Sequence, residues 1–198
     1  MSTLFWKFLK HPRQVGACCP SSPALCREIT SHIGVEKASL VAELGPGTGV
    51  ITAEIYRKLR NGAKLAAVEL DEHLADDIEA RFSDITVFRG CASQLDTMLN
   101  SCDLPPADVV ISGLPFAIFP EELQDKILNG VVRSLIPGGT FATFAYLQGC
   151  ILPAGIRFRK KLESLFPEVT TSPVVWNNMP PAFVYRCRNS ISAGERKS

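Results

Sequence analysis

The sequence predicts an α/β protein with a doubly wound, Rossmann-like sheet of seven strands that ends in an antiparallel hairpin. Short apolar runs alternate with amphipathic stretches of helical length, the pattern of a mostly parallel sheet covered by helices. A glycine turn joins the first clear strand to the first long helix over residues 40–59. Near the C-terminus, two short apolar runs flank a turn, which favours a hairpin that completes the sheet.

Length and composition indicate one domain over residues 1–189, followed by a flexible tail at 190–198. The 198 residues are 46% hydrophobic, enough for one substantial core. Twenty-one basic and twenty acidic residues give a net charge of +1, without the excess of positive charge that nucleic-acid binders usually carry. A nucleic-acid partner is therefore not expected. Since the sequence shows neither an eighteen-residue apolar run nor a signal peptide, we expect a cytoplasmic protein.

The seven cysteines do not predict a disulfide framework or a metal site. Their number is odd, and they form no C-x-x-C motif or Cys/His cluster. We expect reduced thiols and no bound metal, although the adjacent pair Cys18 and Cys19 leaves a redox-sensitive pair as an alternative.

The N-terminal segment, residues 1–33, is predicted to be amphipathic and to cover the domain or a membrane. Residues 3–12 place aromatic and aliphatic side chains at helical spacing among lysines. Such a helix can lie in a membrane interface with its lysines toward anionic head groups, or pack on the domain as a lid. A loop then leads into a helix at Pro23–His32, with Pro23 in its first turn.

The glycine turn is the first candidate binding site. Leu40–Leu44 reads as a buried strand, interrupted by Glu43, and the turn holds Gly45, Gly47 and Gly49 with Thr48 between the last two. Glycines let a ligand approach the backbone, and the next helix presents N–H groups there. The acid before the first glycine would repel a pyrophosphate but suits an ammonium or sulfonium. The alternatives are a tight turn that binds no ligand and a turn that binds a different nucleotide.

This E-x-G-x-G-x-G pattern resembles the first motif of the class I S-adenosylmethionine-dependent methyltransferases. In the next strand, Lys64–Leu70, Glu69 lies some twenty residues beyond the first glycine, where a carboxylate can accept hydrogen bonds from both ribose hydroxyls. Strand-end acids also cap helices, and Asp71 could do so for the helix predicted at residues 72–82. Together with Leu70, Glu69 is assigned to the cofactor.

After the third strand, Ile85–Phe88, the sequence departs from the family pattern. Class I methyltransferases commonly carry an Asp here for the adenine amino group, whereas this chain has Cys91, a poor acceptor. We therefore expect adenine contacts from the backbone around Cys91 and Ala92, or from Ser93. The fourth strand, Ala107–Ser112, follows.

The stretch after the fourth strand is the second candidate site. Base and amide methyltransferases carry Asn or Asp here, followed by a Pro and an aromatic that stacks on the target. In this chain Ser112 takes the place of the acid or amide, and Phe116 supplies the aromatic. The weaker clamp on a planar amine makes bases less suitable acceptors. The alternative is a turn with an apolar plug.

The last elements complete the sheet. The pattern predicts an amphipathic helix at Pro120–Leu135, a fifth strand at Thr140–Leu147 and a basic helix at Ile156–Phe166. The cations of the basic helix form either a solvated face or a site for phosphate head groups. The hairpin is predicted to pair Ser172–Asn177 with Phe183–Arg188.

A narrower resemblance covers nearly the whole chain. The motifs that carry it are Phe8-Leu9-Lys10, Pro12 to Ala17, Pro20-Ser21-Ser22, Val41 to Thr48, Ala67 to Asp71, Ile111 to Pro115, and Asn178 with Pro180 to Arg186. The chain resembles bacterial phospholipid N-methyltransferases, which are similar to ribosomal RNA adenine dimethylases. The resemblance implies S-adenosyl-L-methionine as cofactor and methylation of phosphatidylethanolamine by a protein that visits the membrane through its N-terminal helix. We expect a monomer that contacts an anionic membrane surface transiently.

Three hypotheses follow: a phospholipid N-methyltransferase, an rRNA adenine N6-methyltransferase-like enzyme, and a cofactor-binding protein without transferase activity. The residues assigned to catalysis are Tyr146, which would orient the amine, with Ser112 and Phe116. The residues assigned to the cofactor are Glu43, Gly45, Gly47, Thr48, Gly49, Glu69, Leu70, Cys91, Ala92 and Ser112.

Overall fold

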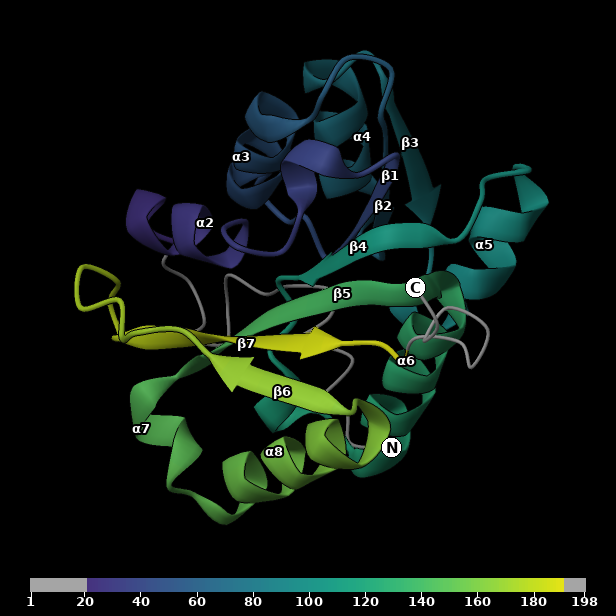
Figure 1. The fold of residues 1–198 in the computed structure, drawn as a ribbon. Coiled ribbons are helices and arrows are strands. Elements are labelled where there is room, and N and C mark those ends of the chain that lie inside the picture. Colours follow the sequence, from purple (N-terminus) through teal and green to yellow (C-terminus); the bar gives the residue numbers. More distant parts are fainter. Residues whose placement is uncertain (1–20, 191–198) are drawn as a thin grey trace.

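The computed structural model describes residues 21–190, and all their strands belong to one seven-stranded sheet of order β3-β2-β1-β4-β5-β7-β6 (Figure 1). The strands are β1 Leu40–Leu44, β2 Lys64–Glu69, β3 Ile85–Arg89, β4 Ala107–Ser112, β5 Leu135–Tyr146, β6 Glu168–Thr171 and β7 Ala182–Arg188. The first five are parallel, whereas β7 runs antiparallel to both β5 and β6. The predicted fold class is therefore confirmed.

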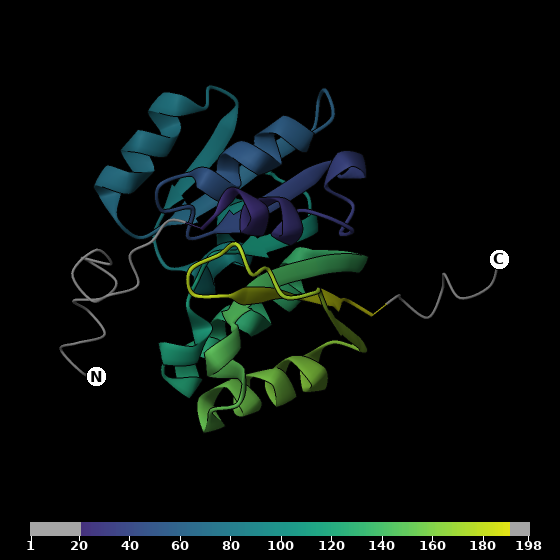
Figure 2. The ribbon, with the colours of Figure 1, turned by 90° about the vertical axis from the view of Figure 1, so that its left-hand side faces the viewer.

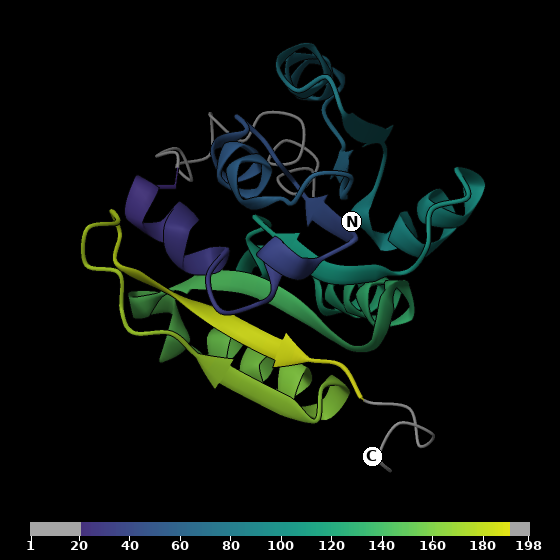
Figure 3. The ribbon, with the colours of Figure 1, turned by 45° about the horizontal axis from the view of Figure 1, so that its top comes forward.

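Helices cover both faces of the sheet. The α-helices are α2 Pro23–Ile29, α3 Val50–Lys58, α4 Glu72–Arg81, α5 Leu95–Ser101, α6 Glu121–Ser134, α7 Leu147–Cys150 and α8 Pro153–Leu165. Buried side chains of α2 and α3 form one core with one face, and those of α5, α6 and α8 form a second core with the other. Figure 3 shows both layers, with the sheet between them.

Two predicted boundaries are wrong for identifiable reasons. The partner of β7 is not Ser172–Asn177 but Glu168–Thr171. The N–H of Val184 bonds to the hydroxyl of Ser172 instead of its carbonyl, and Pro173 has no N–H for the ladder, so regular pairing stops. The fifth strand begins at Leu135 rather than Thr140, because the chain extends directly from the end of α6 through the Pro-Gly-Gly stretch. The short helices α5 and α7 were not predicted.

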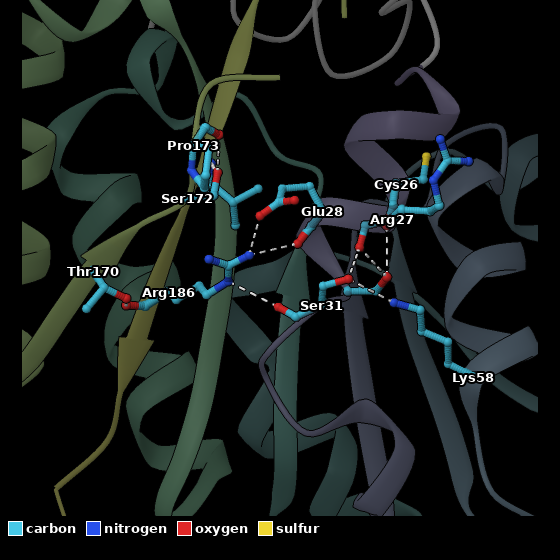
Figure 4. Close-up of polar contacts among 11 residues, drawn as sticks. Cys26, Arg27, Glu28, Ser31, Lys58, Thr170, Ser172, Pro173 and Arg186 are labelled. Carbon is cyan, nitrogen blue, oxygen red and sulfur yellow. Dashed lines mark hydrogen bonds and ion pairs between the residues drawn. The ribbon is translucent and has the colours of Figure 1, made fainter. Parts of the chain in front are cut away.

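Helix α2 is fastened to the far end of the chain. Arg186 of β7 donates to the carbonyl oxygens of Ser31 and Glu28 and pairs with the Glu28 carboxylate at 2.5 Å (Figure 4). The N–H of Ser22 donates to Asn178 Oδ1 at 2.9 Å. The described chain therefore begins beside the loop that precedes β7. The amphipathic segment predicted at residues 3–12, and the tail beyond residue 190, lie outside the described residues.

Candidate active site

The candidate site residues gather where β1, β2 and β4 end. Leu44 is in register with Ser112 across the β1–β4 pair, the point at which the strand order reverses. The N–H of Gly45 bonds to Val68 O and that of Gly113 to Leu44 O, both at 2.9 Å. Ligands of doubly wound sheets bind in the crevice outside this edge, at this switch point. In Figure 1, α7 and the loop before β7 lie on the left-hand side of the molecule, and Figure 2 shows this side from the front.

The glycine turn is open at its second glycine. Gly47 has a φ of +55°, and a Cβ placed on it would meet no atom of residues 21–190 within 4 Å. The first glycine differs, because Leu114 Cδ2 would lie 2.5 Å from a Cβ on Gly45. A Cβ on Gly113 would lie 2.9 Å from the carbonyl oxygen of Gly45, so the strand end and the turn touch backbone to backbone. A ligand therefore has access to the turn at Gly47.

Glu69 joins the turn to the end of β2. Its Oε2 accepts from the N–H of Gly47 at 3.0 Å, and its Oε1 accepts from Leu70 at 2.8 Å and Asp71 at 3.1 Å. A carboxylate offers about four lone-pair positions, so one acceptor position stays unused by these bonds. The Asp71 side chain caps α4 by accepting from the N–H groups of His73 and Leu74, which confirms the helix cap considered in the sequence analysis. Binding of ribose by Glu69 stays a prediction, and Glu69 itself is not the helix cap.

Glu43 lies beneath the turn and is fully buried. Its Oε2 accepts from the Thr52 hydroxyl at 2.7 Å, and its Oε1 has no partner in the described structure. Burial, with a smaller contribution from nearby Glu69, raises the pKa of the Glu43 carboxyl to about 8. At neutral pH the group is therefore mostly protonated. The prediction that a Glu43 carboxylate helps to hold an ammonium or sulfonium ligand is not supported by this geometry, because the side chain is fully buried.

The residues assigned to adenine lie after β3. The Ser93 hydroxyl is 3.2 Å from Cys91 Sγ, and Ala92 is buried at the start of a short 3-10 helix. The carbonyl of Ser93 faces Gly130 of α6, where a Cβ would come within 3.2 Å of it. Thr48 is exposed, and its carbonyl accepts from Arg81 at 2.6 Å. Adenine contacts from the backbone of this segment stay a prediction.

Of the three residues assigned to catalysis, Phe116 is misplaced for that role. Its ring is 2% exposed and stacks on Phe158 at 4.9 Å between ring centroids. It packs against Phe119 and Phe141 as well, so the aromatic cluster holds it in the core. The prediction that this ring stacks on the acceptor is wrong for this structure, and the alternative of an apolar plug describes it.

Ser112 and Tyr146 do lie at the edge. Ser112 is buried, and its hydroxyl accepts from the N–H of Leu114 at 3.2 Å. Tyr146 ends β5, with its ring centroid 5.6 Å from that of Phe144. Sequence reasoning missed Thr143, which is in register with Ser112 and holds a buried hydroxyl without a partner in the described structure. Only strand pairing could have revealed it, because the residue stands in an ordinary alternating run.

Comparison with known proteins agrees with this arrangement. A family model described as "Methyltransferase domain" matches residues 41–139. The ornithine lipid N-methyltransferase of Singulisphaera acidiphila is 33% identical over 187 residues, which cover 92% of each chain. The ribosomal RNA small subunit methyltransferase A of Thermotoga petrophila is 26% identical over 121 residues, which cover 61% of this chain and 44% of that protein.

Solved structures show the same fold. The O-methyltransferase TomG of Streptomyces achromogenes, solved with S-adenosylmethionine (SAM), has a TM-score of 0.67 at 17% identity and covers 96% of this chain and 91% of its own. An O-methyltransferase of Bacillus cereus, solved with S-adenosylhomocysteine (SAH), has a TM-score of 0.64 at 15% identity over 85% and 82%.

The site of this chain fits the cofactor of these enzymes. The turn is open at Gly47, and Glu69 keeps a free acceptor position beside it. The family match and the ornithine lipid N-methyltransferase, which aligns over 92% of each chain, agree with these features. Together they identify the chain as a member of the class I S-adenosylmethionine-dependent methyltransferases, with S-adenosylmethionine as its cofactor.

Proposed function

We propose that this enzyme methylates the primary amine of a membrane lipid, with phosphatidylethanolamine as the expected acceptor. The observation that carries the proposal is the match along nearly the whole chain to an ornithine lipid N-methyltransferase. Ornithine lipid and phosphatidylethanolamine share the chemistry that matters here, a primary amine on a lipid head group. We further propose a cytoplasmic monomer that contacts the membrane transiently. None of the described helices is long and apolar enough to cross a bilayer.

A ribosomal RNA acceptor is the second candidate, favoured by matches to rRNA methyltransferases. The match to the Thermotoga petrophila relative covers only 44% of that protein. The net charge of +1 also offers little to a phosphate backbone. The hydroxyl of Ser112 already accepts from the N–H of Leu114, so it keeps one lone pair for a planar amine, where a carboxylate would offer more acceptor positions. These features favour the lipid amine.

The chemistry asks for alignment more than for acid–base groups. Bound S-adenosylmethionine supplies an activated methyl group on a sulfonium. The residues of the chain have to hold a neutral amine in line with that methyl and keep water away, and good alignment contributes about 7–11 kcal/mol. Ser112, Thr143 and Tyr146 are polar side chains at this edge that can orient an amine. The apolar surroundings of the edge favour the neutral form of the amine.

The test is a methyl-transfer assay with labelled cofactor on four acceptors. Vesicles carry phosphatidylethanolamine, ornithine lipid, or neither, and unmethylated small-subunit rRNA is the fourth arm. We expect label in one or both amine lipids and none in vesicles without an amine, and mass spectrometry then counts the methyl groups. Label in the rRNA alone would select the second candidate. Cofactor binding by calorimetry with no product in any arm would show a binding protein without transferase activity.

A further inference from the structure

Within residues 21–190, large apolar side chains are exposed almost exclusively at one edge. Six of the seven exposed large hydrophobic residues of the described chain lie in three segments, and the seventh, Tyr56, belongs to α3. The six are Ile118, Ile151, Leu152, Ile156, Trp176 and Met179. Ile151, Trp176 and Met179 are 75%, 69% and 76% exposed, so most of each side chain projects into solvent.

The three segments are residues 113–120, 146–156 and 172–182, called here the apolar rim. The first follows β4, the second follows β5, and the third precedes β7, whose first residue pairs with Tyr146 at the end of β5. All three therefore lie at the edge that holds the candidate active site. Figures 1 and 2 show α7 and the loop before β7 side by side at this edge.

Contacts join the three segments into one surface. The N–H of Leu147 bonds to Pro181 O at 2.8 Å, which connects α7 to the loop before β7. Helix α8 packs on α7 at Gly155, where a Cβ would come within 2.2 Å of Gly149 O. The rings of Phe158 and Phe116 stack and connect α8 to the segment after β4. The rim is thus held as a unit.

The apolar rim carries no charge. None of its residues is Asp, Glu, Lys, Arg or His, whereas 21% of the whole chain is charged, so a stretch of this length would ordinarily contain several charges. The cations of α8 next to it are mostly paired: Arg157 with Glu121 at 2.9 Å, Arg159 with Glu163 at 2.8 Å and Lys161 with Asp125 at 2.6 Å. These pairs leave little positive charge for phosphate head groups.

We propose that the apolar rim docks on a lipid bilayer by inserting its side chains into the boundary between head groups and acyl chains. The proposal rests on the proposed function, because a lipid acceptor has to reach this edge from a membrane. A charge-free surface lacks the Lys and Arg that supply most of the affinity for a nucleic-acid backbone. The exposed side chains of the rim are Trp, Ile, Leu and Met, which are residue types that insert favourably at the membrane interface. Apolar insertion, unlike attraction to anionic lipid, depends little on salt.

The rim can be tested apart from catalysis with vesicles of phosphatidylcholine alone, which offer neither negative charge nor a primary amine. We expect the full chain to float with these vesicles, with less than a twofold change between 50 and 500 mM salt. The double variant Ile151→Ser/Leu152→Ser should lower binding about tenfold or more, while Tyr56→Ser, an exposed apolar residue outside the rim, should leave binding unchanged. Equal binding by the double variant would overturn the proposal.

Trp176 gives a direct readout of insertion. The chain has two tryptophans, so Trp6→Phe leaves Trp176 as the single reporter. We expect a blue shift of its emission on phosphatidylcholine vesicles and protection from an aqueous quencher. Emission that stays that of an exposed tryptophan would contradict the docking of this loop. A double variant that changes the oligomeric state on gel filtration, but not vesicle binding, would assign the rim to an interface between two copies.

Failure of the docking proposal is distinguishable from failure of the proposed function. On a short-chain amine lipid dissolved as monomers, the double variant should keep wild-type activity within twofold, and on vesicles it should lose most of it. Docking fails alone when vesicle lipid is methylated equally by both proteins. The proposed function fails alone when the wild type docks through the rim but methylates no lipid amine. Circular dichroism and the melting temperature check that the variants fold.

Discussion

The edge of the sheet at the carboxyl ends of the parallel strands has two halves that present different chemical groups. Around β1–β3, the site consists of backbone N–H groups and a carboxylate, with Glu69 bonded to the N–H groups of Gly47, Leu70 and Asp71. Around β4–β7, it consists of uncharged and largely apolar segments. The family model matches residues 41–139 and so includes the first half completely, but only the beginning of β5. The predicted cofactor side is thus built from fixed backbone groups and one carboxylate, while the predicted acceptor side offers an apolar surface with a few hydroxyls.

The largest expected effect concerns the core under the acceptor side. Phe116→Ala should lower the free energy of unfolding by about 3–5 kcal/mol, because it removes a buried ring that stacks on Phe158. Urea denaturation measures the loss. Phe116→Leu is the matched variant, which keeps most of the apolar volume and should keep methyl transfer. A loss of activity in Phe116→Leu without a loss of stability would return the ring to the acceptor site.

The next effect concerns Glu43, under the cofactor side, and depends on pH. The pKa of this carboxyl in the folded chain, about 8, lies above its ordinary value of 4.5, so the native state holds a proton that the unfolded state has lost. Stability conferred by the protonated form is therefore complete below about pH 4.5, falls as pH rises and is gone above about pH 8. The slope is at most about 1.4 kcal/mol per pH unit.

Glu43→Gln removes this titration and keeps an acceptor for the Thr52 hydroxyl. Denaturation from pH 5 to pH 9 should show the wild type losing stability relative to the variant as pH rises. Thr52→Val separates the hydrogen bond from the ionisation, because it removes the hydroxyl and leaves the carboxyl. Parallel pH curves for the wild type and Glu43→Gln would show that Glu43 ionises in the folded protein at its ordinary pKa.

The smallest of the three effects concerns Glu69. Glu69→Ala should weaken binding of S-adenosylhomocysteine by about 1–3 kcal/mol, measured by calorimetry, because the turn loses its acceptor at Gly47 and the ligand loses the predicted ribose contact. Glu72→Ala, an exposed acid in the first turn of α4, is the matched control and should bind as the wild type does. Unchanged affinity in Glu69→Ala would remove the cofactor role of this residue.

The sequence alone determined the fold class and the location of the glycine turn, and the resemblance carried by its motifs implied the cofactor. Local spacing contains this information, because a short apolar run followed by E-x-G-x-G-x-G prescribes a strand, a tight turn and a helix start within a few residues. The bounds predicted for the first and fourth strands agree with β1 and β4. The position of Glu69 at a strand end likewise followed from the alternation of elements.

Only the tertiary structure decided which side chains face the edge. Phe116 follows Ser112 by four residues, yet the chain turns after β4 so that its ring enters the core. The hydroxyl of Thr143 became visible only when β5 paired with β4. The acids that pair with the cations of α8 come mostly from α6, some forty residues earlier in the chain. Such contacts depend on how distant segments pack, and a local residue pattern does not specify that packing.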